Sequence, residues 1–505
     1  MRRAALAWVA LLAFAAAAAA QSVPKEEELK RYRKQLEPGT SLEPRLEAMK
    51  NVAFYDAVPT TKLLIDSLAA TLKRLEELEA KRVANDGRID RILRAPIEKG
   101  GGKATPDYSG VSELQTAQKV LGRQIADEES AVRGFVETLA TLKRAESLDF
   151  LMGQRPKKPA RLAVTLLETL GRIDDGRVAE HLIGRLEDAS FEVRTAAAAA
   201  LLRQRPEFIP AESFAPLLRS SQWQERSLAI DALARLGGRD AVEMLVVQTT
   251  REDGRMLADL CGRLEQLTGQ KLGKTPPAWV DWWQKNKGAW EGRGIDLSQP
   301  AQVIQSAGRY GSFFSVKFDS LRVVYVIDIS GSMLAAVEDH EELSPAPGKS
   351  RVELARREVK ASINGLSPES SFNLIAYSDV VIPWNDRNVP ATPANRKLAY
   401  EWLDGLTAVG ATNIFDALDT AFHLAPRSTK DSFYATTGDT ILFMSDGGPT
   451  CGRTTDCDEI LAQVREWNRT RRITIHSVGI GRQTVQSFLK ALAKENGGQC
   501  VFIEK

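Results

Sequence analysis

The sequence predicts a multidomain chain that is all-α in its first part and ends in a doubly wound α/β domain. Three observations carry this prediction. Apolar residues recur every seven positions within 58–148, a loose repeat runs over 160–290, and apolar strand patterns alternate with helical patterns from 321 onward. The seven-residue spacing predicts a coiled-coil hairpin, the repeat predicts a stack of paired helices, and the alternation predicts a sheet with right-handed crossovers.

Composition excludes several classes of protein. The chain has 505 residues, of which 43% are hydrophobic and 27% are charged, as in an ordinary soluble globular protein. Lys and Arg total 68 against 66 Asp and Glu, so no global basic field points to a nucleic-acid partner. Four His and four Cys are too few for a His-cluster enzyme or a disulfide scaffold.

The N-terminus has the pattern of an export signal. Arg2 and Arg3 precede an apolar run over 4–20, which ends in three alanines before Gln21. This predicts a cleaved signal peptide over 1–20 and a secreted or periplasmic protein of the bacterial envelope, without an integral membrane span once the signal is removed. An uncleaved N-terminal anchor is the alternative, because the run is near the lower limit for a spanning helix.

After a charged linker with short helices over 21–57, residues 58–148 are predicted to form two long helices. Eight of ten heptad positions in the second helix are apolar, whereas Arg82 and Asn85 interrupt the seam of the first. Gly and Pro residues between the helices predict an antiparallel coiled-coil hairpin, which also offers a route to an oligomer. Two ordinary helices packed on the next domain are the alternative. The ten heptad positions are Val111, Leu114, Gln118, Leu121, Ile125, Glu128, Val132, Phe135, Leu139 and Leu142.

Residues 160–290 contain the loose repeat. Arg161, Arg194 and Arg226 mark similar helical segments at intervals of 33 and 32 residues, and each segment is followed by a second helical pattern. Paired helices of this length must stack to bury their apolar faces, so the region resembles a HEAT-like α-solenoid. It either binds a partner on a concave face or acts as a rigid spacer. Residues 291–320 are predicted to be a linker.

The region 321–505 is predicted to hold the parallel sheet. A continuous apolar run over 323–327 leads directly into Asp328, and further strand patterns cover 372–377, 440–444 and 473–478. Helical patterns separate these strands, as in a doubly wound fold. Functional groups in such sheets lie beyond the carboxyl ends of the strands.

Polar side chains follow three of these structural segments. Asp328, Ser330 and Ser332 share one loop, and Thr412 and Asp446 come from two others. Together they offer two carboxylates and three hydroxyls, which are hard oxygen ligands suited to Mg²⁺, with Mn²⁺ or Ca²⁺ as alternatives. Because most of these ligands are neutral, a bound ion remains electrophilic and can take an Asp or Glu carboxylate from a partner protein.

Three segments resemble the von Willebrand factor A domain, a Rossmann-like fold, with its metal-ion-dependent adhesion site. They are VVYVIDISGSM over 323–333, GATNIFDAL over 410–418 and FMSDGGPT over 443–450. The resemblance covers 321–505 and fills all five metal positions of the family. It implies a metal-dependent protein-binding function without catalysis, in which the serines contact the metal directly and the aspartates often act through water.

Two other functions are compatible with parts of the sequence. A metal-dependent hydrolase is less expected, because Ser330 stands where phosphatases with an aspartyl nucleophile commonly carry a second acid, and the sequence has neither a G-x-S-x-G elbow nor a P-loop. A structural scaffold assembled through coiled coil and solenoid is the main alternative. An acidic insertion over 339–342 is either a solvated loop or a second cation site.

The cysteines are the last candidate residues. Cys451 and Cys457 flank a turn-prone stretch directly after Asp446, and in an oxidising compartment we expect them to form a disulfide. Two thiols holding a soft metal are the alternative. Cys261 and Cys500 are expected to be buried and free.

Overall fold

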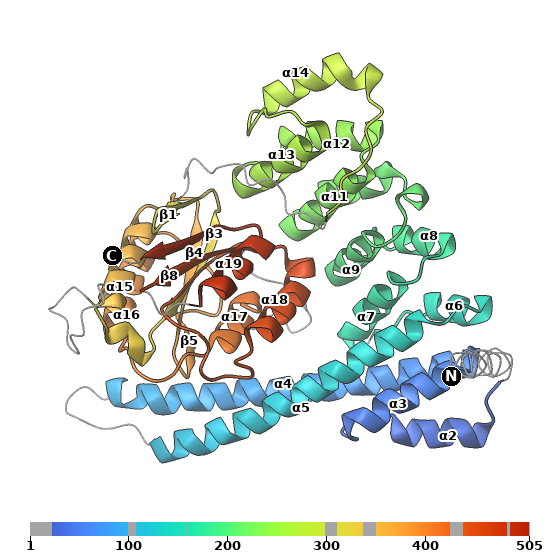
Figure 1. The fold of residues 1–505 in the computed structure, drawn as a ribbon, viewed down its shortest axis with the longest axis horizontal. Helices are drawn as coiled ribbons and strands as arrows, with labels where there is room; N and C mark the ends of the chain where they lie inside the picture. Colours follow the sequence, from blue (N-terminus) through green and yellow to red (C-terminus); the bar gives the residue numbers. More distant parts are fainter. Residues whose placement is uncertain are drawn as a thin grey trace, which may run out of the picture. The chain divides into compact units, whose positions relative to one another are not determined.

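The computed structural model describes residues 23–98, 108–157, 159–297, 311–336, 350–424, 438–481 and 485–503. The predicted signal peptide and the acidic insertion at 339–342 lie outside these residues. The chain forms two compact units, residues 1–208 and residues 209–505. The described part is helical as far as residue 289 and mixed α/β from residue 311 (Figure 1). No helix in the described part is both long and apolar enough to cross a membrane.

The first unit contains two long helices that pack along each other. Gln118 in the second helix donates a hydrogen bond from its amide to the carbonyl of Arg82 in the first, at 3.2 Å. Further along the second helix, Ile125 packs on Leu75 and Leu78, which come earlier in the first, so the two helices are antiparallel. The helical pair is therefore present, whereas the finer interpretation as a coiled coil stays a prediction. The first helices of this unit are α2 (Glu26–Gln35), α3 (Leu42–Ala53), α4 (Val58–Glu98) and α5 (Tyr108–Ala140).

Glu128 belongs to the predicted seam, and its partner lies elsewhere. Its carboxylate accepts a hydrogen bond from the Arg45 guanidinium of α3 at 2.8 Å, with both side chains buried. The backbone N–H of Gly39 donates to the other carboxylate oxygen at 2.9 Å. A buried charge needs such partners, so Glu128 fixes α3 against α5. The side chain of Val111, also placed on the seam, is outside the described ones.

The remaining helices of the first unit contain one copy of a local feature that recurs in the second unit. The Arg194 guanidinium donates to the carbonyl of Asp188 at 2.8 Å. Arg226 in the second unit donates to the carbonyl of Ser220 at 2.9 Å, the same six residues upstream. This equivalence supports the predicted repeat, which as a HEAT-like solenoid remains a prediction. The helices are α6 (Ala145–Met152), α7 (Ala160–Leu170), α8 (Gly176–Gly184) and α9 (Phe191–Leu201).

The helical segment of the second unit ends in an aromatic cap. Trp279 and Trp283 are buried, and the Trp279 indole donates to the carbonyl of Gly273 at 2.8 Å. The chain that comes next is held on α11, because the indole of Trp290 donates to the carbonyl of Gly237 at 3.0 Å. The helices are α10 (Ala215–Leu218), α11 (Trp223–Leu236), α12 (Arg239–Thr249), α13 (Gly254–Thr268) and α14 (Pro276–Asn286).

A sheet of order β5-β4-β3-β7-β8-β9 forms the centre of the C-terminal domain. Strands β4, β3, β7, β8 and β9 are parallel, as predicted. The short β5 and β6 pair antiparallel with β4, so the sheet is mixed rather than all parallel. The strands are β3 (Arg322–Asp328), β4 (Ser371–Tyr377), β5 (Val381–Pro383), β6 (Val389–Pro390), β7 (Thr440–Ser445), β8 (Thr474–Ile480) and β9 (Cys500–Ile503).

Helices cover both faces of this sheet (Figure 1), with α15 and α16 on one face and α17, α18 and α19 on the other. Alternate residues of β3, such as Tyr325 and Ile327, pack in one core with Val359 of α15 and Leu403 of α16. A hairpin of β1 (Gly311–Phe313) and β2 (Val316–Phe318), within the predicted linker, adds Phe318 to that core. The helices are α15 (Arg351–Asn364), α16 (Pro393–Gly405), α17 (Ile414–Phe422), α18 (Cys457–Arg471) and α19 (Gln486–Glu495).

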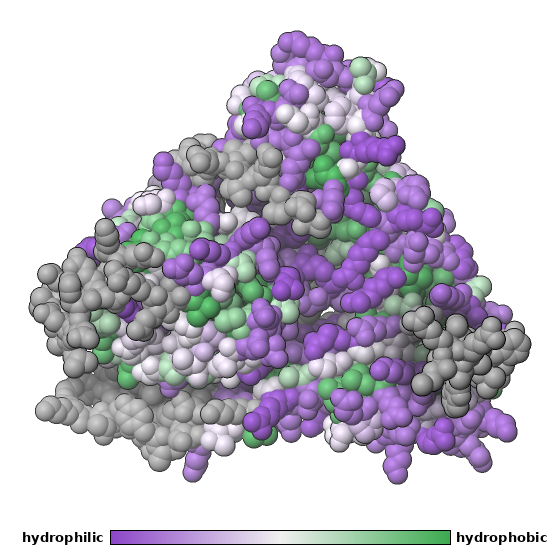
Figure 2. Space-filling view, viewed as in Figure 1, coloured by the Kyte–Doolittle hydropathy of each residue, from purple (hydrophilic) through white to green (hydrophobic). Residues whose placement is uncertain are grey.

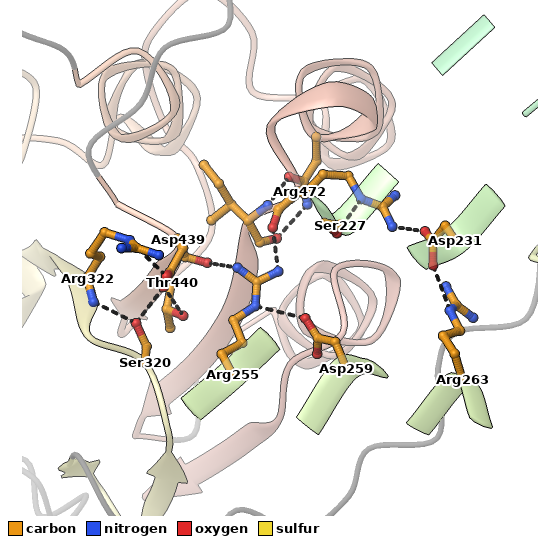
Figure 3. Close-up of polar contacts among 12 residues, drawn as sticks. Ser227, Asp231, Arg255, Asp259, Arg263, Ser320, Arg322, Asp439, Thr440 and Arg472 are labelled. Carbon is orange, nitrogen blue, oxygen red and sulfur yellow. Dashed lines mark hydrogen bonds and ion pairs between the residues drawn. The ribbon is translucent and has the colours of Figure 1, made fainter. Parts of the chain in front are cut away.

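The helical segment of the second unit joins the sheet through a polar network (Figure 3). Arg255 of α13 donates to the backbone carbonyls of Asp439 and Arg472. The Arg472 guanidinium pairs with Asp231 of α11, which also accepts from Arg263 at 2.8 Å. Asp439 directly precedes β7 and Arg472 precedes β8, so these helices meet the amino ends of the parallel strands.

Candidate functional site

The candidate residues gather where the parallel strands end. Asp328 is the last residue of β3, and Asp446 comes directly after β7, its neighbour in the sheet. Carboxyl ends of neighbouring parallel strands meet at one edge, and this places the two carboxylates close together. We call the region formed by Asp328, Ser330, Ser332, Thr412 and Asp446 the carboxyl edge.

Hydrogen bonds connect four of these five residues. The hydroxyls of Ser330 and Ser332 are 3.1 Å apart, and the Ser332 hydroxyl donates to Asp446 Oδ1 at 2.7 Å. The backbone N–H of Ser330 donates to Asp328 Oδ1 at 2.8 Å. Asp328, Ser330 and Asp446 are buried, whereas Ser332 is exposed. Solvent therefore reaches this cluster at Ser332.

Thr412 is placed beside the cluster by its backbone. The Thr412 N–H donates to the Thr450 hydroxyl at 2.8 Å, and the N–H of Thr450 donates back to the Thr412 carbonyl at 2.9 Å. Two residues earlier, the Gly410 carbonyl accepts from the N–H of Gly331 at 3.0 Å. Gly410 has a φ of +84°, and a Cβ there would lie 2.0 Å from Asp379 Oδ1, so the turn requires glycine. The Thr412 loop is thus joined to both other loops.

Two residues that the sequence analysis missed hold Asp328. The Ser445 hydroxyl donates to Asp328 Oδ2 at 2.7 Å, and the Tyr377 hydroxyl lies 3.4 Å from the same oxygen. Burial, with the nearby Asp446 charge, raises the pKa of Asp328 to about 6, against the hydrogen bonds from Ser330 and Ser445. Ser445 and Tyr377 each end a strand, and this position is the feature of the sequence that could indicate them as part of the site.

A buried arginine was also missed. Arg351 Nη1 lies 2.9 Å from Asp446 Oδ2, and both side chains are almost fully buried. Arg351 is the first residue of α15, 95 residues before its partner. Its position at the start of an amphipathic helix predicts a solvated charge, so no local pattern identifies it as part of the site.

The donor atoms at the carboxyl edge fit a hard divalent cation. Two carboxylates and three hydroxyls offer oxygen alone, which Mg²⁺, Mn²⁺ and Ca²⁺ prefer. Within the described residues, no three or more His, Cys, Asp and Glu side chains gather so as to hold a metal. A metal at this edge would therefore need the hydroxyls of Ser330, Ser332 and Thr412 in addition to the two acids.

The cysteines beside this edge are not joined in the structure. Cys451 lies in the loop after β7 and Cys457 begins α18, and both are half-buried thiols. The predicted disulfide therefore stays a prediction. Cys261 is buried, which raises the pKa of its thiol to about 12 and makes it unreactive, while Cys500 is half-buried rather than buried as expected.

Comparison with known proteins places a domain on this part of the chain. The family model "von Willebrand factor type A domain" matches residues 321–502. The human inter-alpha-trypsin inhibitor heavy chain H4 is 32% identical over 177 residues, which are 35% of this chain and 17% of the human protein. The rat heavy chain H3 is 27% identical over 208 residues, 40% of this chain and 22% of that protein. The chain thus spans about a fifth of the length of these relatives.

One solved structure is a von Willebrand factor type A protein from Catenulispora acidiphila. It is 21% identical, covers 38% of this chain and 40% of its own, and has a TM-score of 0.29. A score this low carries no argument about function.

Proposed function

We propose that this chain is an exported, non-enzymatic binding protein whose C-terminal domain takes a protein ligand in a metal-dependent manner. The observation that carries the proposal is the carboxyl edge itself. There, two buried carboxylates and two serine hydroxyls form one hydrogen-bonded cluster that solvent reaches at Ser332. The residues that would hold Mg²⁺, or alternatively Mn²⁺ or Ca²⁺, are Asp328, Ser330, Ser332, Thr412 and Asp446.

The chemistry of this donor set favours an acidic partner. A divalent ion held mainly by neutral hydroxyls would supply an electrophilic centre that accepts a carboxylate oxygen. Ser445 and Tyr377 orient Asp328 through contacts with its Oδ2. The exposed Ser332 marks the side from which a partner would approach. An Asp or Glu side chain on another protein has the charge and the reach that this arrangement requires.

The surroundings of the cluster support a protein partner over a small anion. Leu334 and Val409 are 52% and 61% exposed, and they are among few large hydrophobic side chains so exposed in the described part of the chain. Val409 donates its N–H to the carbonyl of Ile329 at 2.8 Å, which joins its loop to the one that carries Leu334. Exposed apolar side chains on two joined loops beside a charged site are typical of a protein contact surface. Elsewhere, the face shown in Figure 2 is mainly hydrophilic or mixed, with scattered hydrophobic patches.

The burial of Asp328 argues against the hydrolase alternative. An aspartyl nucleophile must reach its substrate, but Asp328 is 0% exposed and both of its oxygens are engaged by Ser330, Ser445 and Tyr377. A purely structural scaffold remains the second candidate, supported by the long α4 and α5 pair. In the proposal, the helical hairpin and HEAT-like repeats present the metal-binding domain, and the N-terminal sequence supports action in the bacterial envelope or outside the cell.

Two measurements on the full chain test the proposal. Titration calorimetry with MnCl2 and MgCl2 should show one saturable site, weakened in Thr412→Val. Immobilised chain should then retain an exported protein in Mg²⁺ and release it in EDTA, while the Ser332→Ala variant should retain less of it in Mg²⁺. Absence of saturable metal binding would reject the function, and retention that EDTA leaves unchanged would favour the scaffold.

A further inference from the structure

Arg351 gives the carboxyl edge a permanent positive charge. Its Nη1 lies 2.9 Å from Asp446 Oδ2, while the Ser332 hydroxyl donates to Asp446 Oδ1 at 2.7 Å. Arg351 is 3% exposed and Asp446 is 1% exposed, so water screens this pair little. One of the two acids at the edge is therefore already matched by a cation of the chain itself.

Contacts of three kinds fix Arg351 in this position. Ser350 caps α15, with its hydroxyl accepting from the N–H of Glu353 at 3.4 Å. The N–H of Arg351 donates to the carbonyl of Ala335 at 3.0 Å, which ties the helix to the end of the Ser332 loop. Gly481, beyond β8, has a φ of +83°, and a Cβ there would lie 2.7 Å from Arg351 Cζ. The fold thus leaves a space for this side chain and directs it at Asp446.

The charge balance at the edge depends on this pair. Without Arg351, the two ionised acids would present a charge of −2 to a divalent cation. With Arg351 in place, the net charge of the carboxyl edge is −1. A fixed positive charge close to a cation site weakens cation binding. The same charge compensates a buried carboxylate, which is strongly unfavourable when it is left alone.

We infer that Arg351 is the resident counter-cation of Asp446, which keeps the loops of the carboxyl edge folded without metal and limits the affinity of the site for divalent ions. Only the statement about affinity for divalent ions rests on the proposed function. The site is then suited to ions at high concentration, and the domain does not depend on metal for its fold. Arg351 is a positioning residue, since it is too deeply buried to meet a partner.

The affinity test compares Arg351→Gln with Arg322→Gln in the full chain. Arg322 forms an ion pair with Asp439 at 3.2 Å at the amino ends of the strands, so it is a matched loss of charge in the same domain. Calorimetry with MnCl2 at constant ionic strength should show about tenfold tighter binding for Arg351→Gln. Arg322→Gln and Arg351→Lys, which keeps the charge, should stay within about twofold of the unmodified chain. Equal or weaker binding by folded Arg351→Gln would overturn the inference.

A second test needs no metal and therefore separates this inference from the proposed function. In EDTA, Arg351→Gln and Asp446→Asn should each lower the melting temperature, and the double variant should melt above the value that additive effects predict. Additive losses would contradict the pairing, even if the chain binds Mn²⁺. If Arg351→Gln does not fold in EDTA, recovery of folding in the double variant supports the pair, and failure of the double variant to recover contradicts it.

Discussion

The two ends of the same sheet carry similar residues but are built for different tasks. At the amino ends, Arg255 donates to backbone carbonyls of Asp439 and Arg472, and Asp231 completes the pairing of the Arg472 guanidinium. At the carboxyl edge, Arg351 meets one of two buried acids, and oxygen acceptors outnumber the cations. At the amino ends, helices α11 and α13 cover the Arg–Asp pair, so a ligand cannot reach it. At the carboxyl edge, the pair of Arg351 and Asp446 lies beside the exposed Ser332, so the site stays open.

In the proposed function, this arrangement separates the attachment of the helices from the recognition of a partner. The helical segment occupies the amino ends of β7 and β8, whereas the exposed Ser332, Leu334 and Val409 lie at the opposite ends of the strands. A change at one end should therefore leave the other nearly unaffected, because sites that share no contacts behave additively. Substitutions at either end of the sheet test this separation.

The largest effect is expected for the acids of the carboxyl edge. Asp328→Asn and Asp446→Asn each remove one of the two negative charges offered to a cation, so calorimetry should detect no saturable Mn²⁺ binding in either. Asp231→Asn removes a buried acid from the amino-end network and is the matched control. It should bind Mn²⁺ like the unmodified chain while melting at a lower temperature. Unchanged affinity in both edge variants would remove the site.

Arg255→Ala should weaken the attachment of the helical segment. It loses two hydrogen bonds to carbonyls and the ion pair with Asp259 at 3.2 Å, together about 3 kcal/mol of unfolding free energy. Hydrogen exchange should rise in α13 and at the start of β7, with Mn²⁺ affinity within about twofold of the original. The exposed Arg251→Ala serves as control. A loss of metal affinity in Arg255→Ala would show that the two ends are coupled.

His476 near the amino end of β8 should make the domain sensitive to acid. Burial, together with the Arg255 charge, lowers the pKa of His476 to about 4, whereas an unfolded His titrates near 6.5. Between these two pKa values, the unfolded state binds more protons than the folded state. The contribution of His476 to the free energy of unfolding is therefore present at neutral pH and decreases as the pH falls. Between pH 7 and pH 5 the loss should be about 2 kcal/mol. Chemical unfolding of His476→Gln should lack this part of the pH dependence, and an identical pH profile would contradict it.

The smallest effect concerns the rim of the carboxyl edge. If Cys451 and Cys457 form a disulfide in exported protein, the free energy of unfolding should rise by about 2 kcal/mol or less, because the closed loop is short. Peptide mapping of non-reduced protein should recover the linked pair. Cys451→Ser should then melt slightly lower under oxidising conditions alone, and Cys261→Ser provides a control for loss of a thiol. Recovery of both cysteines as alkylated thiols would disprove the link.

Features that depend on local pattern could be predicted from the sequence. Asp328, Ser330 and Ser332 share one short motif after an apolar strand, and Asp446 comes after another, so the rule that functional groups lie beyond the carboxyl ends of parallel strands predicts that they share one edge of the sheet. The sequence predicts a parallel sheet, yet β5 and β6 pair antiparallel with β4. These strands have three and two residues and leave almost no periodic signal, so the sequence does not indicate them.

Features that escaped prediction depend on contacts between distant segments. Arg351 is 95 residues from Asp446, and Ser445 is 117 residues from Asp328. Glu128 occupies a heptad position of a helical seam, but its charge is paired with Arg45, 83 residues away on α3. In each case the partner is set by packing of the whole domain, and no spacing within a single helix or strand specifies it.

The way Arg255 holds the sheet has a mechanical consequence. Tension from a partner bound at the carboxyl edge would run lengthwise through β3 and β7 and load their inter-strand hydrogen bonds in shear, as a group rather than one at a time. At the far ends of β7 and β8, Arg255 binds main-chain carbonyls, so the pull passes from the backbone of the sheet directly into α13. Under such tension, the two hydrogen bonds of Arg255 to the main chain would bear the load at the joint between the sheet and α13.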